Sequence, residues 1–119
     1  LTLSRYPHRG LTFAVGGHGK TQFAIQTQYI LAHLPEIDGV ICVGAAGALA
    51  PLNNCDLVVA EKTVEHDFNL KFFVKPPPAF PADAALLNRA QSLSPTGYGV
   101  HFGAIASGDE DVLHRTRSE

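Results

Sequence analysis

Three short stretches hold most of the side chains that could do chemistry, and the most acidic is Ser107-Gly108-Asp109-Glu110-Asp111. Repulsion among neighbouring carboxylates can keep one of them protonated, so this stretch could contact a polar ligand. The same residues could instead cap a following helix, with Ser107 or Asp109 as the N-cap and acids in the first turn. The two interpretations are compatible, and the sequence leaves both open.

The second stretch, Glu65-His66-Asp67, sets an imidazole between two carboxylates. Such a histidine suits a general base or a metal ligand. No second His or Cys lies at ligand spacing, so a metal site is not expected. A structural hydrogen-bonding role, at the end of a strand or in a subunit interface, fits the stretch better.

The third stretch, Ala14-Val15-Gly16-Gly17-His18-Gly19-Lys20-Thr21, is a relaxed match to a P-loop, with Ala14 in place of the first glycine. Its backbone amides and the following helix dipole could hold an anion, with Lys20 adding charge. A P-loop NTPase also needs a magnesium-holding Asp after an apolar strand, and none follows Val40 to Val43. A glycine turn that lets a strand and a helix pack closely is the simpler interpretation.

The stretch from Gly39 to Leu49 predicts a buried strand followed by a turn of very small residues. Val40 to Val43 is apolar on both faces, as in a central parallel strand covered by helices. Gly44-Ala45-Ala46-Gly47 then offers main chain with little side chain, so a ligand can approach it closely. Because ligands bind outside the carboxyl ends of strands in open α/β sheets, this turn is a candidate binding site.

The elements that position these stretches favour an α/β fold. Strands are expected at 11–15, at 40–43, at 56–60 running on toward 64, and at 100–106, with helices at 20–34 and 84–93, the second capped by Asp83. The first strand, the first helix and the next strand form a βαβ unit with a right-handed crossover. Leu1 to Arg9 is expected to be irregular, and the prolines between Phe72 and Pro81 predict a loop or lid.

Length and composition limit the classes of protein. The chain has 119 residues, a net charge of −2 and no basic run, so it is one domain at most, and nucleic-acid binding is not indicated. No apolar run approaches the roughly 20 residues of a membrane-spanning helix. Cys42 lies in the expected buried strand and no Cys-x-x-Cys spacing exists, so a reduced, cytoplasmic protein is expected. The chain starts at Leu1 without methionine and ends in a charged run, so we expect a fragment of a longer protein.

Four segments follow one another in a recognisable order: Gly17-His18-Gly19-Lys20, Val40 to Leu49, Asp56-Leu57-Val58-Val59 with His66-Asp67, and Ala104 to Asp109. Together they resemble the nucleoside phosphorylase and nucleosidase superfamily, most closely the branch that includes 5′-methylthioadenosine/S-adenosylhomocysteine nucleosidase. The resemblance implies a mixed β-sheet flanked by helices, incomplete in this chain, and usually a dimer. The implied reaction is cleavage of an N-glycosidic bond, by water or by phosphate, through an oxocarbenium-like sugar.

The resemblance also implies a nucleoside site on two segments. The first would line the ribose and base pocket with backbone groups and comprises Gly44, Ala45, Ala46 and Gly47. The second would face the base and comprises Glu110, Asp111 and Val112. Purine nucleosidases usually place a stacking Phe where Asp111 falls, so Asp111 would accept a hydrogen bond from an amino or hydroxyl group instead. The resemblance implies no cofactor and no metal.

Two positions bear on the choice between water and phosphate. The phosphorylases of the family place a Ser or Thr hydroxyl where Ala45 stands, and often an Arg where Cys42 stands, both for phosphate. Neither alanine nor cysteine binds that anion well. The resemblance therefore favours a hydrolase that acts on a purine nucleoside, such as methylthioadenosine.

The resemblance implies that the catalytic groups lie outside this chain. The family's first strand, with its catalytic carboxylate, would precede Leu1, and its ribose-binding Glu and later catalytic Asp would follow Glu119. Residues 1–119 would then form a single partial domain, inactive alone, completed by a second polypeptide or acting in a homodimer. Three alternatives stay open: a phosphate-dependent phosphorylase, a non-catalytic nucleoside-binding module, and a P-loop NTPase.

Overall fold

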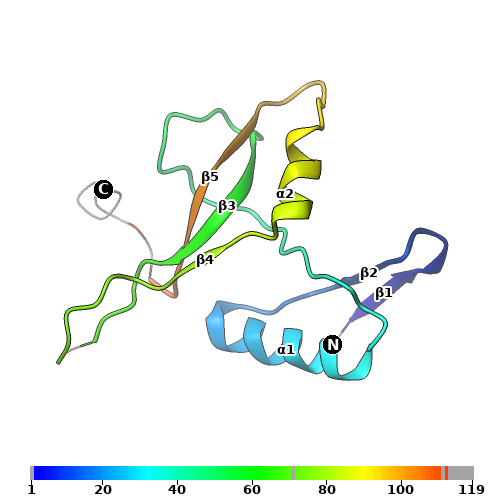
Figure 1. Ribbon diagram of the computed structural model, residues 1–119, viewed down its shortest axis with the longest axis horizontal. Helices are drawn as coiled ribbons and strands as arrows, with labels where there is room; N and C mark the ends of the chain where they lie inside the picture. Colours follow the sequence, from blue (N-terminus) through cyan, green and yellow to red (C-terminus); the bar gives the residue numbers. More distant parts are fainter. Residues whose placement is uncertain (1, 71, 111, 113–119) are drawn as a thin grey trace. The chain divides into compact units, whose positions relative to one another are not determined.

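The structure of the chain is a computed structural model that describes residues 2–70, 72–110 and 112. The chain divides into two compact units, Leu1–Gly44 and Ala45–Glu119 (Figure 1). The first unit holds a two-stranded sheet and a helix, and the second holds a three-stranded sheet and a helix. The candidate ligand-binding turn at 44–47 therefore spans the division between the two units.

The first unit begins with an antiparallel hairpin of β1 (Leu3–Tyr6) and β2 (Leu11–Ala14), joined by a 3₁₀ turn at Pro7–Arg9. The expectation of irregular structure before residue 10 was wrong. Proline fits the first position of a helical turn because its missing N–H is not needed there. Gly10 then takes a left-handed φ of 62°, which turns the chain back along β1.

Helix α1 runs from Gly19 to His33, close to the predicted range. The N–H of Leu34 donates to the carbonyl of Ile30 at 2.9 Å and closes the helix just before the expected stop at Pro35. Leu34 is 7% exposed and is the one buried hydrophobic residue among those that the structure describes. The helix therefore ends where the sequence predicts, although most of its apolar side chains stay at the surface.

Residues 40–43 do not form the predicted buried strand. They are irregular and unpaired, and Val40, Ile41 and Val43 are 52%, 71% and 86% exposed. A strand exists through hydrogen bonds to a neighbour, and no described segment offers one to this run. The predicted βαβ unit is thus absent from the described part of the chain, and Cys42 is exposed instead of buried.

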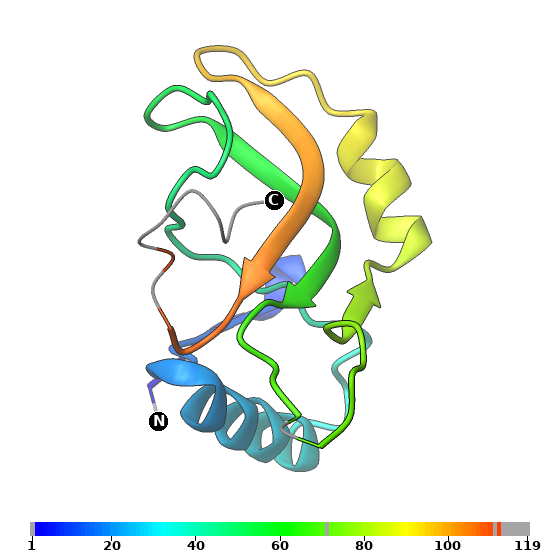
Figure 2. The same cartoon turned by 90° about the vertical axis from the view of Figure 1, so that its left-hand side faces the viewer.

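The second unit is built on β3 (Leu57–Glu65) and β5 (Val100–Ser107), which pair in parallel along most of their length. Figure 2 shows the two arrows pointing the same way. Both strands were predicted from their apolar runs. Because β4 pairs antiparallel on the other side of β3, in the order β4-β3-β5, the sheet is mixed. The predicted fold class, an α/β fold with a mixed sheet, is confirmed.

Strand β4 (Ala79–Pro81) corrects the prediction of a loop from Phe72 to Pro81. Its three residues pair with β3 at 62–64. A proline is tolerated in an edge strand because the N–H that it lacks faces away from the ladder. Residues 72–78 contain neither helix nor strand, as the proline cluster predicts.

Helix α2 (Ala84–Gln91) follows β4 and contacts β3 (Figure 2). The side chain of Asp83 accepts a hydrogen bond from the N–H of Leu86 at 2.9 Å, so the predicted N-cap is confirmed. Such a bond satisfies one of the backbone donors that the first turn of a helix leaves without a partner.

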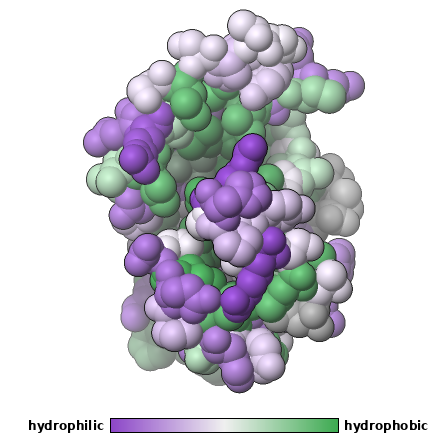
Figure 3. All heavy atoms as spheres, turned by 90° about the vertical axis from the view of Figure 1, so that its right-hand side faces the viewer, coloured by the Kyte–Doolittle hydropathy of each residue, from purple (hydrophilic) through white to green (hydrophobic). Residues whose placement is uncertain are grey.

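Apolar side chains reach the surface over much of the chain, and Figure 3 shows them as green patches among polar residues. Phe72, Phe73 and Val74, for example, are 89%, 70% and 106% exposed. Among the described residues, neither helix is long and apolar enough to cross a membrane.

Candidate functional site

The parallel strands β3 and β5 end side by side, with Glu65 opposite Ser107 (Figure 2). The N–H of His66 donates to the carbonyl of Ser107 at 3.0 Å, so pairing continues one residue beyond β3. Ligands in α/β sheets bind beyond the carboxyl ends of such strands. This edge therefore brings together two of the three chemically active stretches that the sequence singles out, at 65–67 and at 107–110.

Asp67 and Asp109 connect these two stretches directly. The N–H of Asp109 donates to Oδ2 of Asp67 at 2.7 Å. The role expected for the His66-Asp67 pair, a hydrogen-bonding one at the end of a strand, is the one that the geometry supports. In the described part of the chain, no three His, Cys, Asp or Glu side chains are grouped closely enough to hold a metal ion.

Gly108 allows the two stretches to approach each other. A Cβ added there would clash with Nε2 of His66 and would lie 2.8 Å from its Cδ2 and 2.9 Å from Cγ of Asp67. Carbon atoms in ordinary contact lie about 3.5–4.0 Å apart. The glycine in this position is therefore explained by packing, because the imidazole and the carboxyl group occupy the space of a side chain.

The predicted pocket wall, Gly44-Ala45-Ala46-Gly47, is irregular and exposed. A Cβ added at Gly44 or Gly47 would meet no described atom within 4 Å. The open main chain expected from the sequence is therefore present. Gly44 belongs to the first unit and the other three residues to the second, and their role as a nucleoside pocket stays a prediction.

The predicted base-facing segment lies just beyond the carboxyl edge of the sheet. Glu110 is exposed and Val112 is half-buried, whereas Asp111 lies outside the described residues. The helix that this acidic stretch was expected to cap would also begin beyond them. The structure thus places the start of the segment next to the joined ends of β3 and β5, and its contact with a base stays a prediction.

A second group of hydrogen bonds, centred on Asp56, joins β3 and β5 at the opposite end of the sheet. The sequence did not predict it. Oδ1 of Asp56 accepts the N–H of Gly99 at 2.9 Å, and its Oδ2 accepts the N–H of Asn53 at 2.9 Å and lies 3.1 Å from Nε2 of His101. The side chain of Asp56 is 7% exposed. The amides of Asn53 and Gly99, followed by His101, hold the pKa of Asp56 below its usual value. This tie fixes the amino ends of the strands, away from the candidate site.

The glycine turn at 16–19 lies between β2 and α1, as predicted. The N–H of His18 donates to Oε1 of Gln22 at 2.9 Å, so this amide already has a partner within the helix. The ring of Phe23 lies against Gly16, where an added Cβ would clash with it. These contacts support the interpretation that the glycines allow close packing, and they do not favour a phosphate-binding P-loop.

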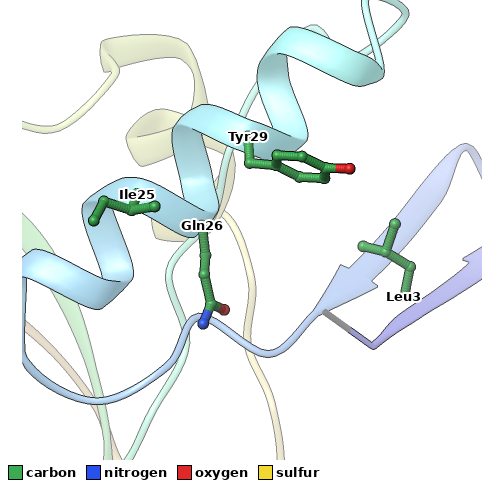
Figure 4. Close-up of a pocket in the computed structure, with 4 residues that line it drawn as sticks. All are labelled: Leu3, Ile25, Gln26 and Tyr29. Atoms are coloured by element: carbon green, nitrogen blue, oxygen red, sulfur yellow. The ribbon is translucent and has the colours of Figure 1, made fainter.

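The first unit also contains an apolar hollow of about 490 Å³. Figure 4 shows the four residues that line it, Leu3 on β1 and Ile25, Gln26 and Tyr29 on α1. The volume suits a small ligand, but Ile25 and Tyr29 are 64% and 54% exposed, and no charged side chain of the described residues lines the hollow. None of the site residues predicted from the sequence takes part in it.

Comparison with known proteins gives two findings. Residues 2–114 match a family model described as the Phosphorylase superfamily. The chain is also similar to a solved structure of 5′-methylthioadenosine/S-adenosylhomocysteine nucleosidase from S. pneumoniae, determined with the transition-state inhibitor MT-ImmA. The two share 27% sequence identity with a TM-score of 0.75, over 90% of this chain and 50% of that one. The chain therefore spans half the length of that nucleosidase.

Proposed function

Because the chain belongs to the phosphorylase superfamily, as its motifs predict, we propose that it is part of a nucleoside N-ribohydrolase. Its substrate would be a 5′-modified purine nucleoside such as methylthioadenosine. The observation that carries this proposal is the likeness to the S. pneumoniae nucleosidase over 90% of the chain, at 27% identity. In this fold a nucleoside would bind beyond the carboxyl edge of the sheet.

Ala45 supports water, in preference to phosphate, as the attacking group. The related phosphorylases bind phosphate through a Ser or Thr hydroxyl at this position and often through an Arg at the position of Cys42. A methyl group makes no hydrogen bond, and a thiol is a weak donor without the charge of a guanidinium. This pair of residues therefore favours hydrolysis over phosphorolysis.

Two segments would hold the nucleoside. Residues 44–47 offer backbone N–H and C=O groups on an open stretch of main chain, which suits close approach by a ribose. Glu110, Asp111 and Val112 would face the base. Carboxylates there can accept hydrogen bonds from exocyclic amino or hydroxyl groups, and Val112 adds an apolar contact.

The bond-breaking groups would come from outside this chain. Cleavage needs an acid that protonates the departing base and a carboxylate that activates water against an oxocarbenium-like sugar. We assign neither role to a residue of this chain, which spans half of the similar nucleosidase. The exposed apolar run at 40–43 fits a domain that further polypeptide completes, from a homodimer partner or a complementing chain. Two free cysteines, Cys42 and Cys55, fit a reducing compartment such as the cytoplasm.

The experiment is an assay of adenine release from methylthioadenosine, with and without phosphate. We expect the complete protein to release adenine at a rate that does not depend on phosphate, and the 119-residue chain alone to release none. Strict dependence on phosphate would identify a phosphorylase instead. Nucleoside binding without turnover in the complete protein would identify a non-catalytic binding module. Turnover by the 119 residues alone would contradict the partial-domain interpretation.

A further inference from the structure

Two turns that lie far apart in the sequence hold each other at the carboxyl edge of the sheet. The N–H of His66 donates to the carbonyl of Ser107 at 3.0 Å. In the opposite direction, the N–H of Asp109 donates to Oδ2 of Asp67 at 2.7 Å, across 42 residues of sequence. That short distance is typical of a hydrogen bond to a charged acceptor. The end of β5 and the turn that follows it are thus each hydrogen-bonded to the turn after β3.

Gly108 lies between the two ties and explains why they can form together. The imidazole of His66 and the carboxyl carbon of Asp67 occupy the space that a side chain at 108 would need. Both residues are half-buried, whereas residues 108–110, which follow β5, are exposed and have neither helix nor strand. An exposed turn of this kind is ordinarily free to take several conformations. Here the better-packed turn after β3 limits that freedom.

Residues 107–110 lead directly into the segment at 110–112 that would face the base. We propose that Asp67, supported by His66, is a positioning residue that fixes this segment for nucleoside binding. The inference rests on the proposed function, since it concerns the same site. Asp67 and His66 would act through the backbone at 107–109, to which both are hydrogen-bonded, without contacting the nucleoside themselves.

The expected change in KM depends on the fraction of molecules in which the turn has the conformation that binds the nucleoside. Apparent affinity falls by the factor by which the binding-competent fraction falls. A hydrogen bond to a charged group contributes on the order of ten- to a hundredfold to an equilibrium, and the exposure of this bond favours the lower figure. We expect Asp67→Ala to raise KM about tenfold and to change kcat less than about twofold, because the bound nucleoside restores the turn.

Two further variants separate positioning from a general loss of stability. Asp67→Asn keeps an oxygen that can accept the N–H of Asp109, so KM should return to within about threefold of the wild-type value. Asp83→Ala is the matched control, since Asp83 also accepts a backbone N–H, that of Leu86 at 2.9 Å. It caps α2 and lies outside the turn at 108–110, so the KM of this variant should equal that of the wild type.

The test uses the complete protein and two readouts. Steady-state release of adenine from methylthioadenosine gives KM and kcat. Hydrogen exchange followed by mass spectrometry gives the protection of the backbone at 105–110 without any substrate. For Asp67→Ala we expect faster exchange in this segment and a raised KM. For Asp67→Asn and Asp83→Ala we expect exchange in the same segment close to that of the wild type.

Several results would overturn the inference. A KM for Asp67→Ala that matches the Asp83→Ala control would show that the tie has no effect on binding. An equal loss of kcat in Asp67→Ala and Asp83→Ala would show that the substitutions act only by destabilising the protein. Absence of turnover in the wild-type complete protein would overturn the proposed function and the positioning role with it, and the exchange data would still show whether Asp67 holds the turn.

Discussion

Replacing Gly108 by alanine tests the packing at the carboxyl edge of the sheet. The added methyl group would clash with Nε2 of His66 and would lie 2.9 Å from Cγ of Asp67. One of these two side chains must therefore move. If Asp67 moves, its hydrogen bond from the N–H of Asp109, now 2.7 Å long, lengthens or breaks.

Three contributions set the size of the loss in stability. Forcing an extra methyl group into a packed position costs about 1–3 kcal/mol, and losing a hydrogen bond costs about 1 kcal/mol more. The smaller entropy of alanine in the unfolded chain offsets about 0.4–1 kcal/mol, because Gly108 does not have the positive φ that would strain an alanine. Since the displaced groups are side chains that can rotate, we expect a net loss of about 2 kcal/mol in the free energy of unfolding.

Urea unfolding of the complete protein measures this loss, and Gly103→Ala provides the control. Gly103 lies within β5, has no positive φ, and has no described atom within 4 Å of an added Cβ. Alanine is favoured over glycine inside a strand by roughly 0.5–1 kcal/mol. We therefore expect Gly103→Ala to match the wild type or to exceed it in stability.

Equal stability of the Gly108→Ala and Gly103→Ala variants would refute the packing argument. A double-mutant cycle sharpens the test. Removing the imidazole with His66→Ala makes room for the methyl group, so Gly108→Ala should cost about 1 kcal/mol less in that background. An unchanged cost would mean that His66 is not the group that the methyl displaces.

Three further predictions concern the rest of the second unit. Because the pKa of Asp56 is lowered in the folded state, that state binds fewer protons than the unfolded state. The stability that Asp56 adds is therefore present above its unfolded pKa of about 4 and is lost as the pH falls further. Asp56→Asn should flatten the dependence of the free energy of unfolding, measured in urea, on pH between about 6 and 3. Asp83→Ala should lower the free energy of unfolding by about 1 kcal/mol in the same assay, because it removes the N-cap of α2. Ala45→Ser should make adenine release by the complete protein respond to added phosphate, and an unchanged rate would show that this position does not select the attacking group.

Local patterns predicted the elements whose own residues determine them. The apolar runs of β3 and β5 and the Asp83 cap of α2 are each encoded within a few consecutive residues of their own element. Glycines and prolines mark the ends of these elements, since their backbone restrictions act locally. The ranges therefore agree with the structure to within a few residues.

The elements that were missed depend on a partner elsewhere. Leu3–Tyr6 contains polar Ser4 and Arg5 and becomes β1 only because β2 turns back beside it at Gly10. In the same way, Ala79–Pro81 becomes β4 because β3 presents a free edge. Strand preference depends on neighbouring strands more than on the residues themselves.

The ties at the two ends of the sheet are hidden from the sequence for a related reason. Asp56 and His101 are 45 residues apart, and Asp67 and Asp109 are 42 residues apart. Their similar separations reflect one fact, the parallel register of β3 with β5. The polar stretches at 65–67 and 107–111 were recognisable in the sequence, but only the register of the two strands shows which carboxylate accepts which backbone N–H.

The run at 40–43 shows what the apolar pattern does and does not predict. Its two apolar faces indicate a position between covering layers, and the exposed fractions of Val40, Ile41 and Val43 show that the described residues supply no such cover. At roughly 25 cal/mol per Å² of apolar surface, leaving several such side chains in water is unfavourable by several kcal/mol relative to burying them. A domain that includes further polypeptide beside this run would recover that free energy. The turn at 44–47 would then be held at the end of a true strand, which is the arrangement that the proposed nucleoside site requires.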